Sequence, residues 1–410
     1  MKLTFGFGKG IQEVTLPDQN LLGVLHANAV TAEETGGQAV RQALEHPIGA
    51  PDLAQVIHPG EKIAIVTSDI TRPCPTWIIL PQLLEKLYEN HIAREDITLV
   101  FALGSHRHHT PEEMRHLAGS AYDEIRCVDS DPDDCICVGL TSRGTPVDIT
   151  RVVAEADRRI CLGNIEYHYF AGYSGGAKAI MPGVSSQAAI QHNHKMMLRE
   201  EAHAGKLAGN PVREDIEEAG RLCGIDYIVN VVLDEHKQII HAVAGDPLEA
   251  HRAGCRFLDR LYYKPIPEQA DIVIVSPGGA PKDLNLYQTQ KALDNAKYSV
   301  RDGGIIILIG SCREGLGNEN FSRWIREAEK PEDLTARVQT KFELGGHKAA
   351  AIAMVLQRVR IYLVTEMDPE LTAKCFMKPY TSAQQALEDA FRELGAGAGV
   401  LAIPCGGSIL

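Results

Sequence analysis

The sequence lacks the features that would indicate a nucleic-acid-binding or a membrane protein. Its 410 residues contain no block of basic residues, and the formal net charge is −13. A surface suited to phosphate backbones is therefore not indicated, and we expect no nucleic-acid partner. No window approaches the roughly 18 apolar residues that a membrane-spanning helix needs, so we expect no membrane partner either.

The start of the chain and its cysteines indicate a cytoplasmic protein. No apolar stretch follows a basic start in MKLTFGFGKGIQEV, and its alternation of apolar and polar residues predicts a hairpin rather than a signal peptide. The ten cysteines are scattered and show no repeated C-x-x-C motif. We therefore expect them to be reduced and buried thiols. Cys135 and Cys137 form a C-x-C pair, which we expect to lie in an ordinary strand.

Apolar segments alternate with amphipathic ones along most of the chain. Six apolar segments predict buried strands: KIAIVTSD (62–69), ITLVFALG (97–104), RRICLGN (158–164), ADIVIVSPGG (270–279), GGIIILIG (303–310) and RIYLVTEM (360–367). Four segments have helical periodicity: WIILPQLLEKLYENH (77–91), PVREDIEEAGRLC (211–223), PLEAHRAGCRFLDRL (247–261) and HKAAAIAMVLQRV (347–359). This alternation predicts an α/β fold with mostly parallel sheets.

The length of the chain indicates two domains, because one domain usually contains about 100–200 residues. The stretch YYKPIPEQAD (262–271) has two prolines and few apolar residues, which favours a boundary there. We predict an N-terminal catalytic and cofactor-tethering domain at 1–265 and a C-terminal α/β domain at 266–395. We expect the tail, 396–410, to return to the N-terminal domain.

Polar clusters follow four of the predicted strands. In parallel sheets, functional loops lie at the carboxyl ends of strands. The clusters there are SDITRPCP (68–75), GSHRHHT (104–110), GNIEYHYFAGYSGGAK (163–178) and SPGGAPKDLNLYQTQKAL (276–293). Their His, Arg, Lys and Asp side chains suggest one composite site.

The glycine-rich stretch GYSGG (172–176) permits more than one interpretation. It matches the G-x-S-x-G nucleophile elbow, which would make Ser174 the nucleophile of a serine hydrolase. The backbone N–H groups around Ser174–Gly176 could instead form a nest for an anion. A standard Walker A loop is excluded, because Ala177 separates Gly176 from Lys178.

Histidines and an Asp–Arg pair occur in the other loops. His106, His108 and His109 cluster in SHRHHT, and His192 and His194 lie in QHNHKMM. Such clusters suggest zinc, but the H-E-x-x-H pattern of metallohydrolases is absent, and solvated histidines are the alternative. SDITRP contains Asp69 and Arg72. The planar fork of an arginine suits a carboxylate, although an Asp–Arg pair could simply pin the loop.

Taken together and in their order along the chain, the motifs of these loops resemble those of the lactate racemase family, the nickel-pincer-nucleotide enzymes. The motifs are SDITRP, GSHR, EYHYFAGYSGGAKAIMPG, NHKMM and DLNLYQTQKAL, and the resemblance extends from about residue 5 to the PCGGSIL end. It implies two α/β domains with an active-site cleft between them. It also implies a pyridinium mononucleotide with two sulfur-containing arms, one of them tethered as a thioamide to a lysine. Nickel would be held by carbon, both sulfurs and one histidine.

The resemblance also implies roles for individual residues. Lys178 is expected to tether the nickel-pincer nucleotide, and His194 to bind nickel. His106 and His168 are expected to be catalytic. Arg72, Gln288 and Lys291 are expected to bind and orient the substrate carboxylate. Contacts to the nucleotide are expected from Asp69, Ser174, Gly175 and Gly176. No role follows for His108, His109 or His192.

The sequence therefore predicts a nickel-dependent racemase of 2-hydroxy acids, with lactate as the default substrate. Hydride would pass to the cofactor and back through a 2-keto acid, because direct deprotonation at Cα is difficult. Maturation proteins that build the cofactor are the expected partners. The alternatives are the same chemistry on malate or a sugar acid, a serine hydrolase using Ser174, and a non-catalytic nucleotide-binding protein.

Overall fold

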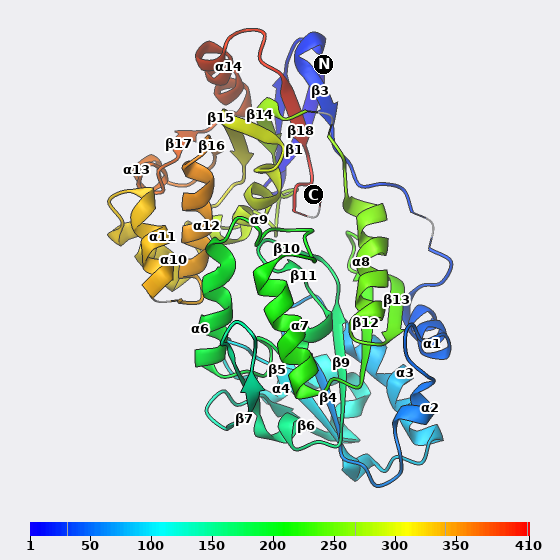
Figure 1. Ribbon diagram of the computed structural model, residues 1–410. Helices are drawn as coiled ribbons and strands as arrows, with labels where there is room; N and C mark the ends of the chain where they lie inside the picture. The colour runs from blue at the N-terminus through cyan, green and yellow to red at the C-terminus, as the bar shows by residue number, and fades with distance from the viewer. Residues whose placement is uncertain (31, 267, 341, 408) are drawn as a thin grey trace. The chain divides into compact units, whose positions relative to one another are not determined.

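The computed structural model describes residues 1–30, 32–266, 268–340, 342–407 and 409–410 (Figure 1). The chain divides into two compact units. One unit comprises Ala29–Leu261, and the other comprises Met1–Asn28 together with Tyr262–Leu410. Each unit is built around a six-stranded sheet with helices against it, so the predicted α/β class is confirmed.

Both ends of the chain belong to the same unit, which corrects the predicted domain assignment. Strand β18 (Val400–Ile403) pairs in parallel with β14 (Ala270–Val275) on one side and with β3 (Leu21–Val24) on the other. The residues at 1–28 and the tail therefore do not join the domain predicted at 1–265. Pairing these strands satisfies backbone N–H and C=O groups that a bare sheet edge would leave open. Short apolar strands suit either sheet, so sequence pattern could not choose between them.

The sheet of the Ala29–Leu261 unit has the strand order β13-β12-β9-β4-β5-β6. All its pairings are parallel except that of the edge strand β13 with β12. Its strands are β4 (Ile63–Ser68), β5 (Ile97–Ala102), β6 (Arg126–Asp129), β9 (Arg158–Asn164), β12 (Tyr227–Leu233) and β13 (Ile239–Gly245). The three strands predicted in this region are confirmed, whereas the fully buried β12 was not predicted.

Helices and small hairpins complete this unit. Its helices are α1 (Gly36–Glu45), α2 (Leu53–Val56), α3 (Thr76–Glu89), α4 (Pro111–Ala118), α5 (Arg151–Ala154), α6 (Gln187–Lys195), α7 (Pro211–Cys223) and α8 (Glu249–Tyr262). Apolar residues of α1, α3 and α4 share one core with the sheet. The two hairpins pair β7 (Cys135–Leu140) with β8 (Pro146–Thr150) and β10 (Tyr167–His168) with β11 (Gly172–Tyr173). Cys135 and Cys137 thus lie in a strand, as predicted.

The second unit contains an all-parallel sheet with the order β17-β16-β15-β14-β18-β3. Its remaining strands are β15 (Val300–Ile309), β16 (Arg360–Val364) and β17 (Lys378–Tyr380), and the predicted N-terminal hairpin is present as β1 (Lys2–Phe7) and β2 (Gly10–Thr15). Its helices are α9 (Leu286–Ala296), α10 (Glu319–Glu327), α11 (Pro331–Thr340), α12 (Gly346–Leu356), α13 (Pro369–Lys374) and α14 (Ala383–Leu394). Among the described residues, no helix is long and apolar enough to cross a membrane.

Candidate active site

Three of the four predicted polar loops emerge at one edge of one sheet. They follow β4, β5 and β9, which are neighbours in the order β9-β4-β5 and run parallel. Their carboxyl ends therefore lie side by side, which brings together the loops that carry Asp69, His106 and Lys178. The fourth loop (276–293) follows β14 and belongs to the sheet of the other unit.

Asp69 holds His106 in a defined orientation. One Asp69 carboxylate oxygen, Oδ2, accepts a hydrogen bond from His106 Nδ1. The other, Oδ1, accepts from Thr71 Oγ1 at 2.7 Å and from the Thr71 N–H at 3.1 Å. Burial alone would raise the pKa of Asp69. The bonds from His106 and Thr71, together with the charge of Arg72, instead leave that pKa below its ordinary value.

This arrangement gives Asp69 a role that the sequence did not predict. The carboxylate pairs with His106 rather than with Arg72, so the Asp–Arg pin is not present. Asp69 is 2% exposed, and a buried carboxylate at Nδ1 fixes both the ring orientation and the tautomer of His106. No described residue forms a hydrogen bond with the other ring nitrogen, Nε2. His106 is therefore arranged as a general base that acts through Nε2.

The neighbouring histidines are structural or solvated. His109 is buried; its Nδ1 lies 2.6 Å from Asp129 Oδ1, and its Nε2 accepts a hydrogen bond from the Ile70 N–H at 3.0 Å. With both nitrogens engaged, His109 braces the β4 and β5 loops against each other. The side chain of His108 is 70% exposed, with Nδ1 at 3.1 Å from Asp129. His109 therefore has no ring nitrogen left for a proton transfer, and His108 is largely exposed to solvent.

His168 lies on β10 and is held as an uncharged ring. Its Nδ1 accepts a hydrogen bond from the Ala171 N–H at 3.2 Å, so the proton of the neutral ring resides on Nε2, which is a hydrogen-bond donor in this tautomer. Burial, and then the positive charges of Lys178 and Arg72, hold the pKa of His168 well below its ordinary value. The ring is therefore neutral at physiological pH.

Lys178 follows the glycine turn on a short 3-10 helix, Gly176–Ala179. Burial, the charge of Arg213 and the charge of Arg72 hold the pKa of Lys178 well below its ordinary value, with Glu166 acting in the opposite direction. A lysine amine without its proton is a nucleophile. The structure thus provides Lys178 with the reactivity that covalent attachment needs.

Two of the N–H groups of the turn at Ser174–Gly176 are bonded within the protein, which argues against the predicted anion nest. The Ser174 N–H donates to the Glu166 carbonyl at 2.8 Å, and the Gly176 N–H donates to Asn230 Oδ1 at 2.7 Å. These two N–H groups are therefore not available to a phosphate. Gly175 and Gly176 have φ of 74° and 60°, and a Cβ at Gly175 would lie 2.6 Å from Asn230 Oδ1. Glycine is needed here because of the backbone conformation and the close packing.

The Ser174 hydroxyl is not arranged as a nucleophile. It donates to the Asn164 carbonyl at 2.7 Å and accepts from the Glu166 N–H at 2.9 Å. His251 contacts the same residue, but its Nε2 donates to the Ser174 carbonyl oxygen at 2.8 Å. A nucleophile needs a base at its hydroxyl, so this geometry does not support the serine-hydrolase alternative.

His194 lies near the end of α6 and is 7% exposed. Its Nδ1 is 2.9 Å from Asn193 Oδ1, and the Asn193 amide donates to Asp215 Oδ2 at 2.8 Å. Thr145 Oγ1 also donates to Asp215, at 2.7 Å, and His192 Nδ1 lies 2.8 Å from the same hydroxyl. Because an amide oxygen is an acceptor, it fixes the His194 proton on Nδ1, so the lone pair of the neutral ring is at Nε2, the nitrogen through which such a ring could bind a metal.

Phe170 brings three of the predicted residues together. Its ring centroid lies 4.5 Å from the ring of His168, 5.0 Å from that of His194 and 5.9 Å from Lys178 Nζ. The expected base, metal ligand and tether therefore surround one aromatic ring. Within the described residues, no group of three or more His, Cys, Asp and Glu side chains is placed to hold a metal ion.

The predicted substrate-binding residues lie in both units. Arg72 is exposed in the β4 loop, and its guanidinium forms no hydrogen bond or ion pair with any described residue. Gln288 and Lys291 are exposed on α9, whose amino end is capped by Asn285. The positive charge of Arg72 contributes to the depressed pKa of His168, so the two side chains lie near enough to interact.

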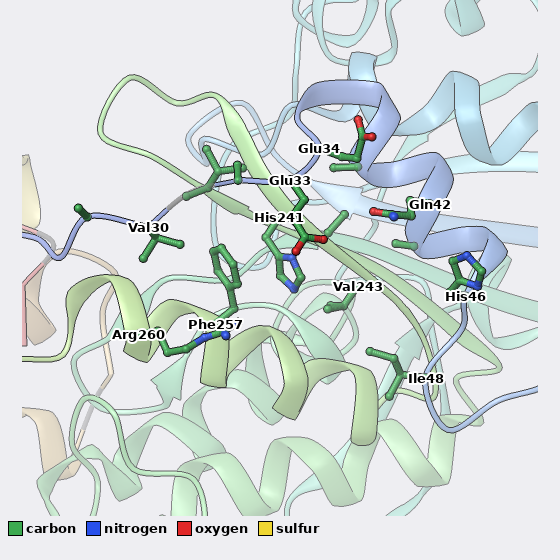
Figure 2. Close-up of a pocket in the computed structure, with 16 residues that line it drawn as sticks. Val30, Glu33, Glu34, Gln42, His46, Ile48, His241, Val243, Phe257 and Arg260 are labelled. Atoms are coloured by element: carbon green, nitrogen blue, oxygen red, sulfur yellow. The ribbon is translucent and has the colours of Figure 1, made fainter.

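A separate cavity of about 680 Å³ lies within the Ala29–Leu261 unit (Figure 2). It is bounded by residues 29–30 and 32–34, by α1, by β13 and by the end of α8. Figure 2 shows His241 beside Phe257, and their stacked rings are 4.0 Å apart. None of the predicted site residues lines this cavity, so it is distinct from the candidate active site.

The sequence did not predict the buried residues that form hydrogen bonds to the backbone of the 171–176 segment. Arg213, Asn230 and His251 hold the segment that carries His168 and Lys178. Asp259 accepts hydrogen bonds from the hydroxyls of two tyrosines in the same hairpin, at 2.7 and 2.8 Å. The available signal was a polar residue on the buried face of an otherwise amphipathic helix, as at Arg213.

Comparisons with known proteins identify the family of this chain. The family model for the lactate racemase N-terminal domain matches residues 7–205, and that for the lactate racemase C-terminal domain matches residues 266–410. The chain is 31% identical to a lactate racemase from Thermoanaerobacterium thermosaccharolyticum, with 98% of this chain and 97% of the relative covered. It is 33% identical to a lactate racemase from Lactiplantibacillus plantarum, with 95% of each chain covered.

Solved structures show the same relationship. The lactate racemase apoprotein from T. thermosaccharolyticum superimposes with a TM-score of 0.90 at 31% identity, covering 100% of this chain and 99% of that one. A Thermotoga maritima protein shares the fold alone, with a TM-score of 0.64 at 19% identity, covering 93% of this chain and 99% of the other. The chain is an isomerase of the racemase class and belongs to the lactate racemase family.

Proposed function

We propose that this enzyme interconverts the two enantiomers of a 2-hydroxy acid, with lactate as the default substrate, and that it uses a nickel-pincer nucleotide attached to Lys178. The observation that carries the proposal is the grouping of His168, His194 and Lys178 around Phe170. The family relatives, both lactate racemases, support lactate as the first substrate to test.

The residues present fit such a group. Lys178 is a partly buried amine whose pKa is depressed by burial and by nearby cations, which suits acylation. His194 has its Nδ1 held by Asn193, which suits metal binding through Nε2. When bound, the group would supply nickel and an acceptor carbon that takes the Cα hydride of the substrate and returns it to the resulting 2-keto acid.

The chain's own residues would manage the proton and the carboxylate. The two enantiomers present their hydroxyl groups differently, so two bases are useful. His106, oriented by Asp69, would accept the hydroxyl proton of one enantiomer. The neutral His168 would accept that of the other at Nδ1, after the hydrogen bond from the Ala171 N–H has opened. Arg72 would hold the substrate carboxylate through a bidentate pair, because its guanidinium is exposed and not otherwise engaged by the described residues.

Other parts of the proposal rest on the resemblance. Gln288 and Lys291 on α9 are proposed to help bind and orient the substrate. Maturation proteins are the proposed partners, since a covalent organometallic group has to be built and attached. We also propose a cytoplasmic location, which the free thiols of all ten cysteines support.

A racemisation assay tests the proposed function. The protein would be produced together with the maturation proteins, its nickel content measured, and each lactate enantiomer supplied alone. We expect stoichiometric nickel and conversion of either enantiomer to an equal mixture, followed by chiral chromatography. Parallel assays with malate and sugar acids would decide the substrate. If nickel-loaded protein racemises no 2-hydroxy acid, the proposal is wrong, and labelling of Ser174 by a fluorophosphonate would favour a hydrolase.

A further inference from the structure

Arg213 is a fully buried arginine directly behind the segment that carries His168 and Lys178. It lies in the first turn of α7 and is 0% exposed. Asn210 caps this helix through the Val212 and Arg213 N–H groups, and its amide donates to the Phe170 carbonyl at 2.9 Å. The start of α7 is thereby fixed against the ring that groups the candidate site residues.

The guanidinium of Arg213 holds the backbone of this segment. Nε donates to the Ala171 carbonyl at 3.2 Å, and Nη2 donates to the Tyr173 carbonyl. The fork therefore spans Gly172, which lies between His168 and Lys178 in the chain. Further along α7, Gly220 packs so closely that a Cβ there would lie 2.7 Å from the Cβ of Ala177. One helix thus supports both ends of the segment that positions Lys178.

The charge of Arg213 is only partly compensated. The nearest carboxylate, Glu217 Oε1, is 3.8 Å from Arg213 Nε. Glu217 is shared with Arg252, whose Nη1 lies 2.7 Å from the same oxygen. Among the described residues, Nη1 of Arg213 has no hydrogen-bond partner. A cation buried in this way exerts a strong field on nearby groups, because little solvent screens it.

Lys178 lies within that field. The charged groups that act on Lys178 are Arg213 on α7, Arg72 after β4 and Glu166 after β9. The neighbouring His168 is acted on by Lys178, Arg72, Arg213 and His194 on α6. Burial is the largest influence on Lys178, and Arg213 is the largest of the charge effects. A lysine amine attacks an acyl carbon only when it carries no proton, since its lone pair forms the new bond.

We propose that Arg213 is a positioning residue that prepares Lys178 for covalent attachment: its fork fixes the backbone at 171–173, and its charge opposes a second positive charge at Lys178 Nζ. This inference rests on the proposed function, in which Lys178 bears the cofactor. It assigns a role in loading the enzyme to a residue that touches neither substrate nor reacting atoms.

The test measures the reactivity of Lys178 in the full chain made without the maturation proteins. A short pulse of an acetylating reagent is applied between pH 6.5 and pH 11, and acetylation of the Lys178 peptide is quantified by mass spectrometry. In wild type, we expect Lys178 to react near its maximal rate already at neutral pH. In Arg213→Gln, we expect at least about a tenfold lower rate at neutral pH, with the wild-type rate regained at high pH.

One further variant separates the effect of the Arg213 charge from that of its hydrogen-bonding fork, and a second variant is a control. Arg213→Lys keeps a positive charge but loses the planar fork. It should retain the pH profile of acetylation while amide exchange at 171–176 becomes faster. Arg252→Gln is the matched control, since it removes a neighbouring arginine that is not among the charges that act on Lys178. It should leave the profile of Lys178 unchanged.

An Arg213→Gln profile identical to that of wild type would overturn the proposal. If Arg213→Gln does not fold, as judged by its thermal transition, Glu217→Gln takes its place. That variant removes part of the counter-charge, so it should speed acetylation several-fold at the lowest pH, and an unchanged rate there would overturn the proposal. Because the experiment involves neither cofactor nor substrate, it remains decisive even if active enzyme proves to carry an unmodified Lys178.

Discussion

Replacement of Asp69 by asparagine tests the arrangement of His106. The carboxylate accepts hydrogen bonds at both oxygens: from His106 at Oδ2, and from the hydroxyl and N–H of Thr71 at Oδ1. An asparagine has only one acceptor oxygen. If that oxygen faces His106, the new NH₂ group faces Thr71, whose N–H is left without an acceptor. If the NH₂ group faces His106, the ring must place its proton on Nε2, where the base is needed.

Either outcome reduces catalysis by an amount that can be estimated. A hydrogen bond to a charged group contributes about 1.5–3 kcal/mol. If this interaction is lost in the transition state, kcat/KM for racemisation should fall by about 10–150-fold. The effect should appear in both directions equally, because the equilibrium constant of a racemisation is fixed. The assay is racemisation by cofactor-loaded Asp69→Asn, followed by chiral chromatography.

Asp226→Asn is the matched control, because Asp226 is another carboxylate that accepts two hydrogen bonds, but at the end of β9 opposite the candidate site. Asp226 accepts from Arg158 at 3.1 Å and from the Arg159 N–H at 2.9 Å, at the amino end of β9. Asp226→Asn should lower the thermal transition but leave kcat/KM within a few-fold of wild type. Equal kcat/KM in Asp69→Asn and wild type would show that Asp69 does not support a catalytic histidine.

Three further predictions concern the remaining site residues. In His168→Gln, single-turnover reduction of the cofactor should be slowed ~10²–10⁴-fold for one enantiomer and much less for the other; rapid-mixing spectra that show equal slowing would refute the two-base assignment. In wild type, the half-reaction that depends on His168 should keep its rate as pH falls through about 6.5, because burial, the largest cause of its depressed pKa, persists after Lys178 is acylated; a midpoint near 6.5 in single-turnover rates would contradict this. Ser174→Ala should retain substantial racemase activity, whereas Arg72→Ala should lower kcat/KM at least about tenfold; the reverse order in steady-state assays would exchange their roles.

Much of the fold could be predicted from apolar periodicity. All six predicted strands and all four predicted helices are present, because buried parallel strands are apolar runs and their covering helices are amphipathic. The assignment of the two ends of the chain could not be predicted. β3 and β18 are short, and their sheet partners are chosen by long-range pairing that no local pattern records.

The sequence suggested candidate site residues but not the contacts that support them. Motif order suggested His106, His168, Lys178 and His194, and three of these four lie around Phe170 in the structure. The glycine motif suggested a phosphate nest, yet its N–H groups are satisfied by Glu166 and Asn230, which is distant in sequence. Such partners come from strands and helices elsewhere in the chain, so only the folded structure reveals them.

The central claim is that Lys178 carries the cofactor covalently, and peptide mass mapping of active enzyme tests it most directly. Protein produced with its maturation proteins would be assayed for racemisation, digested and analysed, with Lys178→Ala as the control. The account predicts an adduct on the Lys178 peptide in a fraction that follows specific activity across preparations, and neither adduct nor activity in the variant. Fully active enzyme whose Lys178 peptide is unmodified would contradict it.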